Sequence, residues 1–162
     1  MMEVRLAGAQ DIELLAEMRL EFLAAVGKAV APQKQAALVE AFKSYAQKEL
    51  GGEGFVAVIC EVDRQAAGAA VMNIGRRPPK PNNLSGMSGY ISNVLTREDY
   101  RGRDCGPAML SRLMEYGAAH GVEEYSLSAS KMGRPVYEKL GFEVNPEPMM
   151  RRFATPGGDG GA

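Results

Sequence analysis

The sequence predicts a single α/β or α+β domain, and three observations support this fold class. The chain has 162 residues, of which 46% are apolar, enough to build one substantial core. Two short apolar runs flank a polar turn, which predicts an antiparallel hairpin. Further along, a strand, a helix and a strand follow one another, an order that places the two strands parallel and side by side.

The N-terminal part is expected to form one short strand and two amphipathic helices. The strand covers residues 4–6, and Asp11 is the expected N-cap of the first helix. Apolar residues recur at helical spacing from Leu15 to Val26 and again within residues 33–50, where two glycines end the pattern. Apolar stripes of this kind are typical of core packing.

The middle of the chain is expected to supply the hairpin and a central strand. The hairpin strands cover residues 55–62 and 67–74, and the next strand covers residues 90–96. Between them, residues 75–88 are rich in proline, glycine and asparagine, so they form a loop. Its basic residues, Arg76, Arg77 and Lys80, are either simply solvated or border a substrate site.

The C-terminal part is expected to contain two helices, a fifth strand and a closing pair of strands. These elements cover residues 106–120, 125–129, 133–140, 142–144 and 149–153. Residues 154–162 contain too little apolar surface to fold, so they are expected to be disordered. The single domain therefore covers residues 1–153.

Composition argues against several classes of partner. The formal net charge is −1 with 24% charged residues, so no overall charge favours nucleic acid. There is no run of about 18 apolar residues and no signal-peptide core, which argues against a membrane segment. Cys60 and Cys105 form neither a metal motif nor a disulfide framework. We expect a soluble protein of the cytoplasm without a metal.

A charged turn between the central strand and the next helix has the features of an anion site. A helix start presents unpaired backbone N–H groups and the positive end of the helix dipole. Arg101 and Arg103 lie in this turn, and Gly102 and Gly106 allow close approach of a ligand. The turn therefore predicts a phosphate or pyrophosphate site, although an ordinary strand-to-helix turn would give the same short pattern.

Two segments together resemble the GCN5-related N-acetyltransferase (GNAT) family, whose members transfer an acetyl group from acetyl-CoA to an amine. They are NVLTREDYRGRDCGPAMLSRLMEYG, at residues 93–117, and SLSASKMGRPVYEKLGF, at residues 126–142. The resemblance is close over residues 89–153. It implies a mixed, mostly antiparallel sheet, flanked by helices, with a central parallel strand pair splayed apart for CoA.

The resemblance also implies which residues bind the pyrophosphate of acetyl-CoA. They are Arg101, Gly102, Arg103, Asp104, Cys105, Gly106, Pro107 and Ala108. Asp104 stands where the family usually has glycine. Its carboxylate either weakens phosphate binding, by roughly 1 kcal/mol near a solvated surface, or turns back to cap the helix. Pro107 removes one backbone donor.

Further roles are implied for residues nearer the thioester. Val94 and Thr96 would pair with the pantetheine arm, and a backbone N–H near Val94 would bind the oxyanion. Ser130 occupies the position of a polar pantetheine contact. Tyr137 would lie near the CoA sulfur as the general acid, since a phenol with a pKa of about 10 can protonate a thiolate.

The base that deprotonates the amine is left open. An amine with a pKa of about 10.4 is protonated at pH 7, so some group must accept a proton. Glu61, Glu98, Asp99 and a bound water are the alternatives. Covalent catalysis by Cys105 is less attractive, because the only histidine, His120, lies at the far end of the same helix.

The sequence therefore predicts an acetyl-CoA-dependent N-acetyltransferase that acts by direct transfer. One alternative is a non-catalytic acyl-CoA-binding regulatory module, and another is a turn that holds a different nucleotide's phosphates. The amine acceptor, a small molecule or a protein, is not indicated. Many members of the family form dimers, so a homodimer is one expectation, although no heptad pattern indicates an interface.

Overall fold

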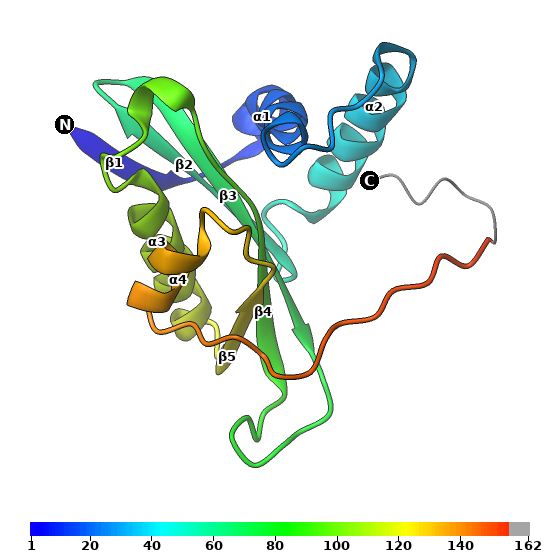
Figure 1. Cartoon of the computed structure of the whole chain (residues 1–162), viewed down its shortest axis with the longest axis vertical. Coiled ribbons are helices and arrows are strands. Elements are labelled where there is room, and N and C mark those ends of the chain that lie inside the picture. The colour runs from blue at the N-terminus through cyan, green and yellow to red at the C-terminus, as the bar shows by residue number, and fades with distance from the viewer. Residues whose placement is uncertain (156–162) are drawn as a thin grey trace.

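The computed structural model describes residues 1–155 and has a mixed α/β fold built on one five-stranded sheet (Figure 1). The strands lie in the sheet in chain order: β1 (Met2–Leu6), β2 (Phe55–Val62), β3 (Gln65–Arg76), β4 (Met87–Thr96) and β5 (Glu124–Leu127). The first three pairings are antiparallel, whereas β4 and β5 are parallel. The expected hairpin and the expected parallel pair are both confirmed.

Helices cover both faces of the sheet (Figure 1). Helices α1 (Ile12–Ala25) and α2 (Pro32–Glu49) lie on one side, and α3 (Cys105–Ala119) and α4 (Arg134–Lys139) lie on the other. Two short 3-10 helices, η1 (Ala9–Asp11) and η2 (Glu98–Tyr100), precede α1 and follow β4. Within residues 1–155, no helix combines the length and the apolar character that a membrane crossing requires.

Two hydrophobic clusters lie on opposite faces of the sheet. Leu15 and Met18 of α1 are fully buried in one cluster, as their helical spacing predicts. Met109, Leu110 and Leu113 of α3 are fully buried in the other. Each face of the sheet is therefore held by the apolar stripe of one long helix.

Asp11 has a different role from the expected N-cap. Its side chain makes no capping bond to α1. Its carboxylate instead accepts two hydrogen bonds of 2.9 Å from the Arg5 guanidinium and one of 2.8 Å from the backbone N–H of Gly8. These bonds, Arg5 foremost, hold the pKa of Asp11 below its usual value. Asp11 thus fixes the connection between β1 and α1.

Strand β4 contains a bulge at Asn93. Val71 of β3 pairs with Ser92 and Ala69 pairs with Leu95, so Asn93 and Val94 together lie opposite one residue of β3. Asn93 has a left-handed backbone, with φ of 55°. The bulge shifts the alternation of side chains along β4. Ile91 consequently packs in the cluster beneath α3, whereas Leu95 packs in the cluster beneath α1.

The parallel strand β5 is held close to α3 by a glycine. A Cβ at Gly117 would lie 2.5 Å from the hydroxyl of Tyr125, too close for any side chain. That hydroxyl donates a 2.8 Å hydrogen bond to the backbone oxygen of Met114. The absence of a side chain at Gly117 therefore lets β5 pack on α3 and reach its place beside β4.

The expected closing strands at residues 142–144 and 149–153 are wrong. Residues 142–153 contain no strand, and β5 has a neighbour in the sheet on one side only. Pro146 and Pro148 supply no backbone N–H to a ladder. The side chains of Val144, Met149 and Met150 are largely exposed. Of the expected disordered tail, residues 156–162 lie outside the described part of the chain.

Candidate active site

The parallel strands β4 and β5 separate partway along their length. Their pairing runs from Ser88 and Glu124 to Ile91 and Leu127 and ends there, while β4 continues to Thr96. This geometry leaves an opening in the sheet, namely the edge of β4 beyond Ile91, which has no strand partner on the side of β5, as the splayed pair of the expected fold requires.

Val94 and Thr96 present their backbone groups to this opening. Leu95 pairs with Ala69 of β3, and the N–H of Arg97 donates to the oxygen of Ala67 at 2.8 Å. Since successive residues of a strand direct their backbone groups to opposite edges, those of Val94 and Thr96 face away from β3. An extended ligand lying in the opening can pair with them as an added strand would.

The N-terminus of α3 lies at the end of the loop that follows β4. The backbone N–H groups of Cys105 and Gly106 have no partner inside the helix, because they belong to its first turn. Pro107 has no N–H to offer, and Pro107 and Ala108 are half-buried. Residues 101–104 are exposed, and Gly102 has a positive φ of 76°. The loop is therefore exposed and lies beside free backbone donors, which are features that an anion site requires.

Asp104 adopts a left-handed backbone, with φ of 61° and ψ of 21°. In the family that the sequence resembles, this position is usually glycine. The conformation explains that preference, since glycine has no Cβ and adopts a left-handed backbone without strain. The side chain makes no capping hydrogen bond, so the expectation that it caps α3 is wrong. An exposed carboxylate remains beside the free N–H groups.

The two arginines of the loop are both exposed but differ in their contacts. The Nε of Arg101 donates to the backbone oxygen of Thr96 at 3.4 Å, which links the loop to the open edge of β4. The guanidinium of Arg103 lies 5.6 Å from the centre of the Tyr100 ring. The structure thus brings Thr96 and the loop together.

Cys105 contributes only its backbone to this surface. Its side chain is 2% exposed, and its Sγ donates to the oxygen of Tyr100 at 3.8 Å. Burial and the neighbouring Cys105 raise the pKa of the Cys60 thiol to about 12. His120 stacks on Tyr116 at the other end of α3, so it is not a base for Cys105.

Tyr137 projects from α4 into the cluster beneath α3. It is half-buried, its ring lies edge-on to Phe142 with centroids 6.2 Å apart, and burial raises the pKa of its phenol. It lines a cavity of about 890 Å³, which Tyr90 of β4 and Ser128 also line. The cavity extends along β5, α4 and residues 142–149, and its lining includes none of Val94, Thr96, Ser130 and residues 101–108.

Ser130 closes the turn that leads into α4. Its Oγ accepts a 3.1 Å hydrogen bond from the N–H of Gly133. The hydroxyl hydrogen remains available to a ligand, since an oxygen that accepts one bond can still donate.

Two side-chain pairs near the opening were missed by the sequence reasoning. The hydroxyl of Tyr90 lies 3.2 Å from the Oγ of Ser128, and Nη1 of Arg19 donates to Oδ1 of Asn93 at 3.2 Å. The expected parallel strands could have suggested the first pair. No sequence signal indicates the second, because it depends on the bulge.

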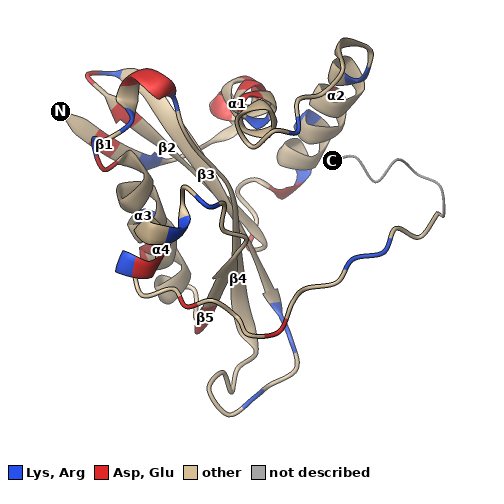
Figure 2. Ribbon diagram, in the orientation of Figure 1, with Lys and Arg blue, Asp and Glu red and all other residues tan. Residues whose placement is uncertain are grey.

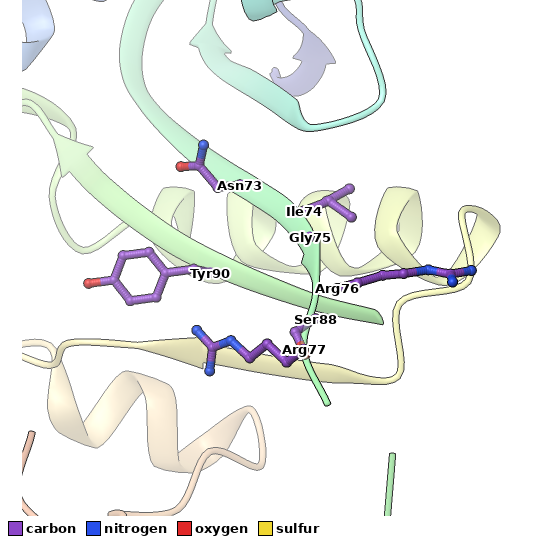
Figure 3. Close-up of a pocket in the computed structure, with 7 residues that line it drawn as sticks. All are labelled: Asn73, Ile74, Gly75, Arg76, Arg77, Ser88 and Tyr90. Atoms are coloured by element: carbon purple, nitrogen blue, oxygen red, sulfur yellow. The ribbon is translucent and has the colours of Figure 1, made fainter. Parts of the chain in front are cut away.

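A smaller cavity, of about 200 Å³, lies where β3 ends and β4 begins (Figure 3). Its lining residues are Asn73, Ile74, Gly75, Arg76, Arg77, Ser88 and Tyr90. Figure 3 shows Arg77 and Tyr90 extending to the same side, whereas Arg76 extends to the other. The basic loop, for which solvation and a place beside a substrate site were the two alternatives, thus supplies Arg77 to both cavities.

The carboxylates considered as the general base lie in different surroundings. Glu61 of β2 accepts a 3.0 Å hydrogen bond from Nε of Arg5, and β3 separates its strand from β4. Glu98 and Asp99 are exposed on η2. The position of Glu61 argues against a role in catalysis. Within residues 1–155, no group of three or more histidine, cysteine or acidic residues could hold a metal ion.

Comparison with known proteins identifies similar sequences and structures. Residues 18–142 match the model of the acetyltransferase (GNAT) family. A glucosamine 6-phosphate N-acetyltransferase of Trypanosoma brucei brucei is 34% identical over 61 residues, which are 38% of this chain and 42% of that protein. The match therefore spans less than half the length of this curated relative.

Two solved structures are similar over nearly their whole length. A predicted acetyltransferase of Clostridium acetobutylicum, solved with acetyl-CoA, is 31% identical, with a TM-score of 0.79 over 94% of this chain and 96% of that one. A GCN5-related N-acetyltransferase of Ralstonia eutropha is 24% identical, with a TM-score of 0.82 over 96% of this chain and 100% of that one.

Proposed function

Because the chain belongs to the acetyltransferase (GNAT) family, we propose that it transfers an acetyl group from acetyl-CoA directly to an amine. The family and its solved members support an N-acetyltransferase with acetyl-CoA as co-substrate. The observation that carries the proposal is the separation of β4 from β5 beside the exposed start of α3. This arrangement offers backbone donors to a diphosphate and an open strand edge to an extended arm.

In this proposal the cofactor lies along β4 with its diphosphate at residues 101–108. The free N–H groups of Cys105 and Gly106 and the positive end of the helix dipole favour the anion. Arg101 and Arg103 are long enough to fold over it and bind two oxygens each. The pantetheine arm pairs with Val94 and Thr96, and Ser130 donates to it from the other side.

The proposed reaction forms one bond and breaks another. The neutral amine attacks the thioester carbon, and a backbone N–H near Val94 stabilises the oxyanion. When the intermediate collapses, the carbon–sulfur bond breaks and Tyr137 donates its proton to the leaving thiolate. The raised pKa of Tyr137 keeps the phenol protonated at neutral pH. The base is Glu98, Asp99 or a bound water.

The alternative of a non-catalytic acyl-CoA-binding module has one specific observation in its favour. The exposed carboxylate of Asp104 lies beside the donors that would bind the diphosphate. Two measurements separate the alternatives: calorimetry of acetyl-CoA, ATP and NAD, and a screen of amines with detection of released thiol. Turnover with any amine supports the enzyme, whereas tight acetyl-CoA binding without turnover supports the module. Binding of ATP or NAD that is tighter than binding of acetyl-CoA would contradict both the enzyme and the acyl-CoA-binding module.

Three expectations stay predictions. The chain forms one domain over residues 1–153, it lies in the cytoplasm, and it forms a homodimer. The open edge of β5 and the exposed side chains of Met149 and Met150 support the dimer, because an unpaired strand edge and apolar surface favour association. Light scattering after gel filtration would test it, and a monomer at micromolar concentration would contradict it.

A further inference from the structure

Arg19 of α1 is a half-buried cation without an acidic partner. Its Nη1 donates to Asn93, and its guanidinium lies 5.9 Å from the centre of the Phe22 ring. No ion pair joins it to a carboxylate of residues 1–155. Burial lowers the pKa of Arg19, which means that its surroundings do not compensate the charge.

The carboxylates on the same helix are already paired with other cations. Arg97 binds Glu17 at 3.1 Å and Glu21 at 2.7 Å, and Lys43 of α2 binds Glu13 at 2.7 Å. Figure 2 shows acidic residues on α1 in red. Arg19 is therefore left without a carboxylate on its own helix, and an anion from outside the chain would complement its charge.

Asn93 adds an unsatisfied donor beside this cation. The residue is 4% exposed, and its Nδ2 has no hydrogen-bond partner in the structure. Because Oδ1 accepts from Arg19, the orientation of the amide is fixed and Nδ2 remains a donor. A buried donor without a partner is rare in folded proteins and requires an explanation. An oxygen atom of a ligand would satisfy it once a shift of the surrounding side chains uncovers Nδ2, which the chain encloses in this structure.

This pair lies next to the proposed site of acetyl transfer. Asn93 precedes Val94, whose N–H is the proposed oxyanion donor. Further along the same face of the sheet, Asn73 donates to Tyr45 of α2, and Tyr90 lies directly across from Asn73. The face of β4 on the side of α1 and α2 thus offers hydrogen-bond donors close to where the amine must react.

We propose that the amine acceptor carries an anionic group, a carboxylate or a phosphate, which Arg19 and Asn93 bind. This inference rests on the proposed acetyl transfer and names the chemical class of its acceptor. An arginine can donate two parallel N–H hydrogen bonds to either anion, and Nδ2 of Asn93 supplies a third donor. The amine is thereby held beside Val94 by a group that takes no part in the reaction.

The first test compares amines with and without an anionic group. Glucosamine 6-phosphate is paired with glucosamine, and an α-amino acid is paired with its carboxamide, with spermidine as a cationic amine. We expect kcat/KM to be at least about tenfold higher for the anionic member of one pair. The first pair reports on phosphate and the second on carboxylate.

The second test uses variants of the two residues. Arg19→Gln should raise KM for the anionic amine about tenfold to hundredfold and change KM for the neutral amine little. Arg19→Lys should give a KM for the anionic amine between those of the wild type and Arg19→Gln. Asn93→Asp should abolish the preference, because the new carboxylate pairs with Arg19. Arg64→Gln, which removes a charge from the exposed β2–β3 turn, is the matched control.

Acetyl-CoA affinity and melting temperature are measured for every variant. If Arg19→Gln lowers kcat/KM equally for both members of a pair, Arg19 only supports the fold. This result would overturn the inference. Neutral or cationic amines that react as well as anionic ones would overturn it while leaving acetyl transfer intact. A wild-type protein that neither binds acetyl-CoA nor releases thiol would overturn both proposals.

Discussion

The hydroxyl of Tyr90 lies 3.2 Å from the Oγ of Ser128, one residue beyond the last pair between β4 and β5. This contact joins the two strands at the point where they separate. It therefore sets the closed end of the opening in which we place the thioester.

Tyr90→Phe removes this contact and keeps the ring. A neutral hydrogen bond contributes about 0.5–1.5 kcal/mol, so stability should change little, while kcat should fall about twofold to tenfold as the strands lose their spacing. Steady-state kinetics and thermal melting measure the two effects. Ser128→Ala removes the same bond from the other side and should reproduce the result. If Ser128→Ala leaves kcat unaltered, the contact has no role in catalysis.

Tyr137→Phe should lower kcat by about a hundredfold, in the range for loss of a general acid, and leave the dissociation constant of acetyl-CoA nearly unchanged. Burial raises the pKa of Tyr137 above its ordinary value, so the wild-type kcat should fall only at strongly alkaline pH, where the phenol ionises. This alkaline limb should be missing in the variant. Equal loss of binding and turnover would show that Tyr137 is structural.

Asp104→Gly should tighten acetyl-CoA binding and raise the melting temperature. Glycine relieves the left-handed backbone, worth roughly 1 kcal/mol, and the substitution removes a carboxylate from the anion site. Calorimetry and thermal melting measure the two gains. Asp104→Ala separates them, because it removes the charge but keeps the strain. Weaker binding by both variants would mean that the carboxylate itself contributes to the site.

Asp11 should make stability depend on pH in the acid range. Its pKa is lowered in the folded state by Arg5, so its contribution is complete above the unfolded value of about 4 and is lost as pH falls through the folded pKa. Asp11→Asn should cost about 2 kcal/mol at pH 7, since Arg5 is only one-third exposed. Urea unfolding from pH 2 to pH 7 measures the pH dependence of the wild-type stability and the destabilisation by Asp11→Asn. The difference between variant and wild type should shrink toward pH 2.

The two cysteines should remain unreactive in the folded protein. Both are buried, and the thiol of Cys60, with a pKa of about 12, is protonated at pH 8. A thiol reagent should therefore label them slowly until the protein is unfolded. Mass spectrometry after incubation with acetyl-CoA alone should detect no acetylated protein. An acetyl adduct on Cys105 would contradict direct transfer.

Much of the fold was predictable because it follows from local patterns. The apolar stripe around Leu15 and Met18 predicted α1, and the two apolar runs on either side of a polar turn predicted the β2–β3 hairpin. The closing strands failed for a physical reason. Residues 142–153 are apolar enough to suggest strands, but a strand requires a partner, and the two prolines remove donors that a ladder needs.

The candidate site was predictable in part. The loop at residues 101–108 is contiguous, so its glycines and arginines are visible in the sequence. The left-handed backbone of Asp104 and the contact between Arg19 and Asn93 were not visible. The latter joins residues 74 positions apart through a bulge, and no local pattern encodes such a pairing.

The extra residue in β4 also limits how the chain can change in length. Removing Asn93 would return the strand to strict alternation, and every side chain after it would exchange faces. Leu95 would leave the layer beneath α1 and enter the layer beneath α3, which is already filled. A surface loop would absorb such a one-residue deletion, whereas here the deletion would invert the end of the central strand, residues 94–96.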